Sequence, residues 1–425
     1  MSLEFAKIVA QVQTMGRYLA HTANANSTRL ERALELFYAA DDLQVVHDRI
    51  ELVRSSSVSG YRGAAPAPKP YDELIPGVGG APVPPDGATI LAVDGSQVYP
   101  DAHESALYYL INIGIFAYYF GVSRLPDQAT YAELYYSEKA MHDRDGRVLT
   151  NQAVNMRRSV MEMQWLARES WARQDEARPL LAIHDGALLK FFGAADVSDA
   201  GQLEDDYMEA LVQLQDAGAL LIGYGDRPRG AALISLLHLL RLHPREINDV
   251  TLRTNGDLEG LSDAMLLAQV LAPGERSALM TQNSPQNKEY SDRGNFRLKK
   301  VQDSGAVPNF AKGDFEIAFF YINVTDVGAA KIVRVDLPMW AGRHPEAIDA
   351  IHALVLAQCS IQGRKRYPYA LTRADEMAYV SSPEKAHLDE MIRVAMRSNM
   401  LEPEASNKLQ TKDLARGART RHRLR

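Results

Sequence analysis

The apolar positions along the chain predict strands first and an alternation of helices and strands afterwards. Three apolar segments, at residues 88–94, 106–120 and 130–136, have the composition of strands, and no helical pattern separates them. Beyond them, helical spacing alternates with short apolar runs. The expected elements are a helix at 154–174, a strand at 180–185, a helix at 204–216, a strand at 219–224 and a helix at 230–240.

This order of elements is that of the ribonuclease H-like fold. In that fold the first strand pairs in parallel with the fourth, and the right-handed crossover between them places residues 90–94 beside residues 180–185. We therefore predict an α/β protein with a ribonuclease H-like mixed sheet flanked by helices. An N-terminal helical arm and C-terminal helices are expected as additions to it.

The remaining patterns divide the chain into four regions. Residues 1–54 have the apolar spacing of a helical arm, and residues 55–87 have the Pro, Gly and Ser content of a linker or loop. The domain itself is expected at 88–400, with the ribonuclease H-like core at about 88–241. Residues 401–425 are expected to form a basic tail.

Finer boundaries follow from local composition. The helical arm is expected to break near residues 21–26, and the polar segment 281–313 is expected to be a long loop. The later elements are expected to be a helix after residue 260, strands at 315–322 and 331–336, a helix at 345–358, and helices after residues 371 and 383.

Composition and charge narrow the class of protein. The 425 residues are 46% hydrophobic and 24% charged, as in soluble globular proteins. Cys359 is the only cysteine, which excludes an intramolecular disulfide and a cysteine-based metal site. The start of the chain lacks the pattern of a signal peptide, and the apolar segment 106–121 is too short to span a bilayer. We therefore expect a cytoplasmic protein that does not cross a membrane.

The end of the chain differs in charge from the rest. Residues 407–425 contain seven Lys and Arg residues and one Asp, a formal charge of +6 in a chain whose total is −7. A basic tail on an acidic protein suits a polyanionic partner, although a solvated charged end explains it as well.

Two apolar runs end on an Asp-Gly pair. Asp94 follows the run at 88–93, and Asp185 follows the run at 179–184. A single such pair is ordinary turn chemistry. Two of them at the ends of neighbouring strands would place two carboxylates at one edge of a sheet, which is the usual arrangement of a site for a hard cation. His184 points to the opposite sheet face from Asp185, and we expect it to be a core residue.

Further acids and cations extend this candidate site. Glu162 lies among large apolar residues of the long helix, and Glu169 on the same face is its rival, although Arg173 at i+4 favours a solvated ion pair for Glu169. Three consecutive cations, Arg364, Lys365 and Arg366, precede two tyrosines and the acid Asp375. Cations interleaved with aromatic residues favour a polyanion site over a merely solvated face.

With these motifs in place, the sequence resembles the NurA nuclease family from about residue 88 to residue 382. Each motif is weakly specific by itself, and the resemblance rests on their order and spacing. The matching pieces are residues 91–96, 156–162, 184–188, 261–264, 273–277, 333–338 and 367–371. Family membership implies a ribonuclease H-like core, a homodimer, and manganese-dependent 5′-to-3′ exonuclease and endonuclease action on DNA. It also implies a hexameric HerA-type ATPase, a translocase, as partner in DNA end resection.

The resemblance assigns roles to individual residues. By position, Asp94, Glu162 and Asp185 correspond to the acidic metal ligands of the family, and Tyr367 corresponds to its active-site tyrosine. The family commonly has histidine where this chain has Asp375. An aspartate keeps an oxygen ligand for a hard cation, so metal binding is expected to survive with an altered metal preference.

The expected mechanism is two-metal hydrolysis of phosphodiesters. Two Mn²⁺ ions, with Mg²⁺ as the alternative, would be held about 4 Å apart by the four acids, and Tyr367 would orient a phosphate or the attacking water. Single-stranded DNA or the ends of duplex DNA are the expected substrates. The cations expected to follow the DNA backbone without reading its sequence are Arg364, Lys365, Arg366, Lys299, Lys300 and Arg276.

Three other classes of protein compete with this interpretation. A metal-dependent adhesion module would begin like residues 94–98, but Val98 stands where its second serine is needed. A catalytically weak NurA-like scaffold that binds DNA and a HerA-type ATPase is compatible with Asp375 and with the unmatched N-terminal arm. Phosphotransfer on an aspartyl nucleophile would need a second acid where Ser96 stands.

Overall fold

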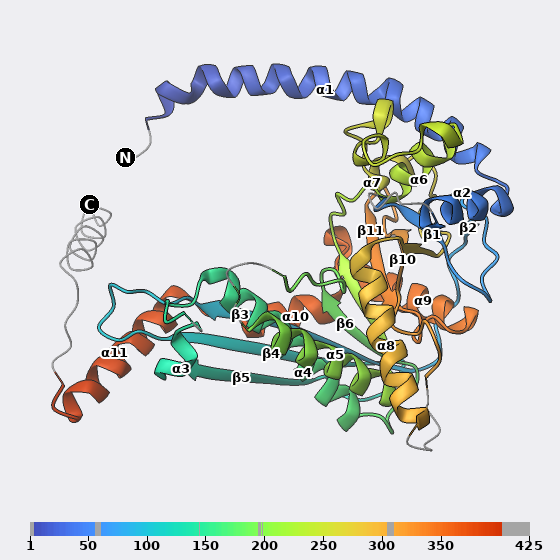
Figure 1. Cartoon of the computed structure of the whole chain (residues 1–425). Helices are drawn as coiled ribbons and strands as arrows, with labels where there is room; N and C mark the ends of the chain where they lie inside the picture. The colour runs from blue at the N-terminus through green and yellow to red at the C-terminus, as the bar shows by residue number, and fades with distance from the viewer. Residues whose placement is uncertain are drawn as a thin grey trace. The chain divides into compact units, whose positions relative to one another are not determined.

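The computed structural model describes residues 4–55, 61–143, 145–193, 197, 199–303 and 310–401 (Figure 1). It contains two compact units. The first unit comprises Met1–Pro85, Gly186–Leu189 and Leu220–Pro368. The second comprises Asp86–Asp185, Lys190–Ala219 and Tyr369–Arg425.

The second unit is built on a mixed sheet whose strands lie in the order β6-β3-β4-β5. Strands β3, β4 and β5 form an antiparallel meander, and β6 pairs with β3 in parallel. The predicted parallel pairing of the first and fourth strands is therefore confirmed. The elements of this unit are β3 (Ala88–Val98), β4 (Tyr109–Phe120), β5 (Asp127–Tyr135), α3 (Glu138–Met141), α4 (Asn151–Ala172), β6 (Leu180–Asp185), α5 (Ala200–Asp216), α10 (Tyr369–Ala378) and α11 (Ser382–Ser398).

Helices cover both faces of this sheet around β3, with α4 and α5 on one face and α10 on the other (Figure 1). Strand β3 is buried on both sides from Ala88 to Val93, which explains its continuous apolar run. Two glycines let the helices approach. A Cβ on Gly95 would lie 2.7 Å from Glu162 Oε1 of α4, and a Cβ on Gly114 of β4 would lie 2.3 Å from the carbonyl oxygen of Ala374 in α10.

The first unit contains an antiparallel sheet in the order β1-β9-β10-β11-β7, with β8 joining β2 to β10. Its elements are α1 (Phe5–Ala39), α2 (Leu43–Ser55), β1 (Ala64–Pro66), β2 (Val78–Gly79), β7 (Leu220–Gly225), α6 (Ala232–Arg241), η1 (Pro244–Glu246), η2 (Thr251–Arg253), η3 (Gly256–Leu258), α7 (Asp263–Leu267), β8 (Arg276–Ser277), β9 (Met280–Gln282), α8 (Pro285–Asp303), β10 (Ile317–Asn323), β11 (Ile332–Pro338), α9 (Pro345–Ile361) and η4 (Gly363–Lys365).

The core of the first unit lies where α6 packs against the end of α1, α2, α7 and the sheet. Leu233, Leu237 and Phe319 are among its fully buried side chains. Each such side chain contributes about 1.5–3 kcal/mol by leaving water. The buried Asp263 carboxylate accepts hydrogen bonds from Ile234 N at 3.0 Å and from the Tyr321 hydroxyl at 2.7 Å, which ties α7 to α6 and β10.

The prediction of a mixed α/β fold flanked by helices is confirmed, but three local predictions are wrong. Helix α1 runs without a break through residues 21–26, because that segment contains neither Gly nor Pro and alanine favours the helix. The segment 281–313 is not one long loop, since it contains α8, which begins at Pro285 after Ser284. The described part of the expected linker, 61–85, forms β1 and β2 and buries Tyr61.

The basic tail and the membrane expectation stand differently. The basic tail from residue 402 onward lies outside the described residues. No helix in the described segments has the length and apolar content needed to cross a membrane.

The close packing of α10 on β4 leads to a stability prediction. Gly114→Ala should lower the free energy of unfolding by about 1–3 kcal/mol, because the new methyl group meets backbone atoms of α10 that cannot rotate away. Thermal unfolding followed by circular dichroism measures the loss. Gly16→Ala in α1 is the matched control, because nothing lies within 4 Å of its new Cβ and alanine favours a helix interior. A variant Gly114→Ala as stable as wild type would contradict this packing.

Candidate active site

Two aspartates lie at the C-terminal ends of the parallel strands β3 and β6. The parallel register ends with Val93 opposite His184, so Asp94 and Asp185 are the next residue of each strand. The backbone N–H of Gly95 donates a hydrogen bond to Asp94 Oδ1 at 2.8 Å. Asp94 is half-buried, whereas Asp185 is exposed. The strand ends thus bring together the two carboxyl groups that the Asp-Gly pairs predicted.

The two sheet faces divide the acids at this end of the sheet. Asp94 is directly opposite Gly114 in the antiparallel ladder, so the two residues share the face that α10 covers. Gly95 points the other way and faces Glu162 on α4. Asp375 is an exposed residue of α10, close enough for its charge to act on Asp94. The acids therefore approach the strand ends from both faces.

Glu162 is the buried acid of the group. Its side chain is 6% exposed, and Arg158 Nε lies 3.5 Å from its Oε1. Arg158 also donates a hydrogen bond from Nη1 to the Gly95 carbonyl at 2.6 Å, which holds α4 against β3. Among the described residues, Glu162 Oε1 has no hydrogen-bond partner. By contrast, the rival Glu169 forms the expected i+4 ion pair with Arg173.

Burial and mutual repulsion raise the pKa values of two of these acids. The pKa of Asp94 is raised to about 6, chiefly by burial, while the Gly95 hydrogen bond opposes the shift and the charges of Asp185 and Asp375 add to it. The pKa of Glu162 is raised to about 7, again chiefly by burial. Arg158 opposes that shift, and Asp94 and Asp185 reinforce it. A cation placed among them would stabilise their charged forms.

His184 is a buried neighbour of Glu162. It is 1% exposed, as expected for a core histidine, and its Nδ1 lies 4.0 Å from Glu162 Oε2. Burial holds the pKa of His184 well below its ordinary value, so the ring is neutral. Neither ring nitrogen has a hydrogen-bond partner within the described parts of the chain.

The group suits a hard cation by its chemistry more than by its present geometry. Carboxylate oxygens are the ligands that Mg²⁺ and Mn²⁺ prefer, and one of them, Glu162 Oε1, is buried without a hydrogen bond. In the described structure, however, no three His, Cys, Asp or Glu side chains are arranged so that they could hold an ion as they stand. The acids on the two sheet faces would have to turn toward one another to share one.

Comparison with known proteins assigns the chain to a family. The family model described as the NurA domain matches residues 88–380, more than half of the chain. The chain belongs to the NurA family. It therefore belongs to a family of nucleases, and the predicted resemblance is confirmed.

A solved structure agrees with the NurA assignment at the level of the fold. The crystal structure of the NurA nuclease from Sulfolobus solfataricus is 11% identical in sequence and covers 92% of this chain and 98% of its own, with a TM-score of 0.51. A likeness at that identity shows the fold alone. No curated protein matches the chain.

Ser96 has a structural partner in this NurA-family chain. Its hydroxyl donates a hydrogen bond to the Ala378 carbonyl at the end of α10, and Asn112 Nδ2 donates to the same oxygen at 2.8 Å. The serine therefore anchors α10 on the face that carries Asp94. Asp375 lies one turn before that anchor.

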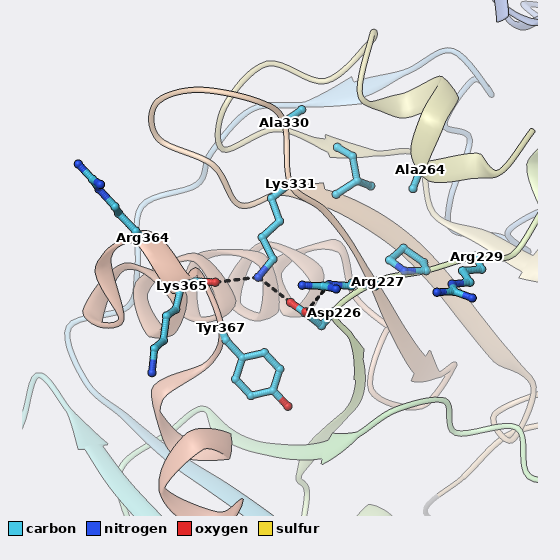
Figure 2. Close-up of a pocket in the computed structure, with 11 residues that line it drawn as sticks. Asp226, Arg227, Arg229, Ala264, Ala330, Lys331, Arg364, Lys365 and Tyr367 are labelled. Atoms are coloured by element: carbon cyan, nitrogen blue, oxygen red, sulfur yellow. Dashed lines mark hydrogen bonds and ion pairs between the residues drawn. The ribbon is translucent and has the colours of Figure 1, made fainter. Parts of the chain in front are cut away.

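Tyr367 and the cations beside it belong to the first unit, where they line a surface pocket of about 760 Å³ (Figure 2). The Tyr367 ring meets the Tyr224 ring edge to face, with centroids 5.3 Å apart. Arg364 and Lys365 line the same pocket. The chain reaches α10, and with it Asp375 in the second unit, directly after Tyr367 and Pro368.

Two of the cations predicted to bind DNA are engaged within the protein. Arg276 is buried, and its guanidinium binds both carboxylate oxygens of Glu73, at 2.7 and 3.1 Å. Arg366 forms an ion pair with Asp326, and its side chain is 14% exposed. Both guanidinium groups are therefore engaged in ion pairs within the protein, which leaves them less available to DNA than the prediction assumed. Lys299 is exposed on α8, and the side chain of Lys300 lies outside the described structure.

Sequence reasoning overlooked residues on both units. Arg158 has no predicted role, although its position four residues before Glu162 is a sign of an ion pair that the sequence shows. Arg227 and Arg229 follow β7 and line the pocket beside Lys331. They are isolated cations in the sequence, and only the pairing of β7 with β11 brings them close to Lys331.

The raised pKa of Glu162 leads to a prediction on pH and stability. The folded protein holds this proton more tightly than the unfolded chain, so the group destabilises the fold increasingly as the pH rises from about 4.5 to about 7. Glu162→Gln should therefore gain stability relative to wild type at pH 8 and gain little at pH 5. Thermal unfolding at both pH values, in the presence of chelator, measures the difference.

Glu169→Gln is the control for that measurement. It removes a carboxylate from the same helix but breaks the ion pair with Arg173, so no gain at pH 8 is expected. A Glu162→Gln variant that is less stable than wild type at pH 8 would show that the buried charge is compensated.

Proposed function

We propose that this NurA-family chain is a metal-dependent DNA nuclease that hydrolyses phosphodiester bonds at the ends of β3 and β6. The observation that carries the proposal is the pair Asp94 and Glu162, partly or wholly buried acids whose pKa values are raised by burial and by the neighbouring carboxylates. Buried acids that repel one another at the end of a sheet mark a candidate functional site, and a cation would stabilise their charged forms. The family supports the choice of substrate.

The proposed metal ligands are Asp94, Glu162, Asp185 and Asp375, and the proposed ions are Mn²⁺ with Mg²⁺ as the alternative. When bound, such ions supply a lowered pKa for water and stabilisation of negative charge on the leaving oxygen. Two groups support this set: Glu162 Oε1, which has no hydrogen-bond partner among the described residues, and the half-buried Asp94. The arrangement of the side chains on two sheet faces means that they must rotate before they can act together.

The protein's own residues would prepare the site. Arg158 holds Glu162 and the Gly95 carbonyl, so it positions the buried acid against β3. Asp94 is held by the Gly95 N–H, which limits its rotation. Tyr367 is proposed to orient a phosphate or a water molecule, a role that rests on its position in the family's motif.

The finer properties rest on family membership alone. We propose 5′-to-3′ exonuclease and endonuclease action, a homodimer, a cytoplasmic location and a hexameric HerA-type ATPase as partner in processing DNA ends. Single-stranded DNA or the ends of a duplex are the proposed substrates.

Removing the acids tests the proposed reaction. Asp94→Asn, Asp185→Asn and Glu162→Gln should each lower the manganese-dependent cleavage of linear DNA by at least about a hundredfold, because each removes a negative ligand. The assay follows a length-marked DNA with free or blocked ends, with manganese or with chelator. Blocked ends separate endonuclease from exonuclease action.

Matched variants keep this test specific. Glu169→Gln on α4 and Asp206→Asn on α5 remove carboxylates of the same unit outside the site, so both should cut like wild type. Circular dichroism checks that each variant is folded. Undiminished cutting by Asp94→Asn or Asp185→Asn would refute the site.

The scaffold hypothesis is the second candidate, because no three described acids are arranged to hold an ion. It predicts that the wild-type chain binds DNA but leaves it intact with every divalent metal. The same digestion assay therefore decides between the two functions.

The position of Asp375 leads to a prediction on metal preference. Asp375→His should raise the ratio of manganese-supported to magnesium-supported cleavage several-fold, because imidazole favours the softer ion. The rates are measured at matched metal concentrations. Glu376→His is the control, because Glu376 is paired with Arg373 on the same helix and should leave the ratio unchanged. An unchanged ratio for both variants would remove Asp375 from the metal site.

A further inference from the structure

The surface pocket of the first unit collects positive charge from three separate segments. Arg227 and Arg229 come from the loop after β7, Lys331 immediately precedes β11, and Arg364 and Lys365 come from η4 (Figure 2). Asp226 is the one acid among its eleven lining residues. The charge of the lining therefore favours an anionic ligand.

The single acid is already neutralised within the protein. Lys331 Nζ lies 2.6 Å from Asp226 Oδ1, and Arg227 Nε lies 3.7 Å from Oδ2. In the described part of the chain, the side chains of Arg229, Arg364 and Lys365 have no acidic partner. Three cations thus line one cavity without an acidic partner among the described residues, which leaves them available to an anionic ligand.

Hydrogen bonds from Lys331 hold the segment that carries Arg364 and Lys365 in place. Lys331 Nζ donates a hydrogen bond to the carbonyl oxygen of Lys365 at 2.7 Å (Figure 2). It also donates one to the carbonyl oxygen of Arg366 at 3.0 Å. Arg366 adopts a left-handed backbone conformation, with φ of 48°, which a residue other than glycine seldom adopts without support. Its ion pair with Asp326 and the bonds to its carbonyl supply that support. Lys331 is therefore a positioning residue for the two cations.

The walls of the pocket add apolar and aromatic surface to this charge. Pro228, Ala330 and Ile332 line it, and Tyr367 lines it from the segment between η4 and α10. A base that has left a duplex stacks on such surfaces whatever its identity. Phosphate contacts without base readout bind any sequence.

We infer that this pocket binds a phosphodiester strand, with successive phosphates of single-stranded DNA held by Arg229, Arg364 and Lys365. The inference rests on the proposed nuclease function for the identity of the strand. It replaces Arg276 and Arg366, which are engaged within the protein, by Arg229 of the loop after β7 as the third cation of the strand site.

The test measures binding without cleavage. The variant Arg229→Ala/Arg364→Ala/Lys365→Ala is titrated into a fluorescent oligo-dT in the presence of chelator, and anisotropy is followed at several KCl concentrations. We expect at least a tenfold weaker affinity at about 0.1 M salt. The slope of log affinity against log salt should fall by about 2, since each phosphate contact on a single strand contributes about 0.7.

A charge-matched control excludes a general effect of net charge. Arg17→Ala/Arg245→Ala/Arg253→Ala removes three exposed cations of the same unit that do not line the pocket. It should keep the wild-type affinity and slope. Circular dichroism of both triple variants confirms that they are folded.

Several outcomes would overturn the inference. Equal losses in the two triple variants, an unchanged affinity in the pocket variant, or a wild-type chain that does not bind oligo-dT at low salt would each do so. Displacement of the oligonucleotide by micromolar dTMP would assign the pocket to a free nucleotide instead. Because the assay contains chelator, a failure to cut DNA with manganese refutes the nuclease proposal alone and leaves this binding result readable.

Discussion

The parallel pairing of β3 with β6 imposes the constraint on which the candidate site depends. It brings Asp94 and Asp185 to the same end of the sheet, where burial and the neighbouring carboxylates raise the pKa of Asp94. The carboxyl group of Glu162 on α4 is a second buried acid close to this strand end, and its pKa is raised as well. Because Asp94 and Glu162 resist ionisation where the fold holds them, they lower the stability of the protein near neutral pH, and a bound cation would compensate for that loss.

Two glycines make that constraint sterically feasible. Gly95 leaves room for Glu162 on one face of β3, and Gly114 leaves room for the backbone of α10 on the other. Arg158 and Ser96 then fasten the two helices to the strand with hydrogen bonds to backbone oxygens. The small residues therefore set how closely the helices approach, and the polar contacts fix which acid each helix brings to the strand ends.

Charge is handled differently in the first unit. There, buried or partly buried cations such as Arg276 and Arg366 are matched one to one with Glu73 and Asp326. Around the pocket cations outnumber acids, because Lys331 and Arg227 share the one carboxylate of Asp226. The surplus of cations is thus local and follows from the way three segments meet, while the chain as a whole carries a net negative charge.

Most elements of the β3–β6 sheet could be predicted from local pattern, since apolar spacing and strand-ending Asp-Gly pairs act over a few residues. The sequence therefore predicted the parallel pair and the buried position of Glu162, and with them the nuclease family. The predictions for α1 and α8 were wrong. In α1, alanine favours the helix through residues 21–26, and α8 begins at Pro285 after Ser284 in spite of its polar composition. Which charged side chains form ion pairs depends on contacts between distant parts of the chain. Arg276 and Glu73 lie 203 positions apart, and no local pattern can reveal a partner at that distance. The same long-range packing placed Asp94 and Glu162 on opposite faces of one strand and gathered Arg229 with Arg364.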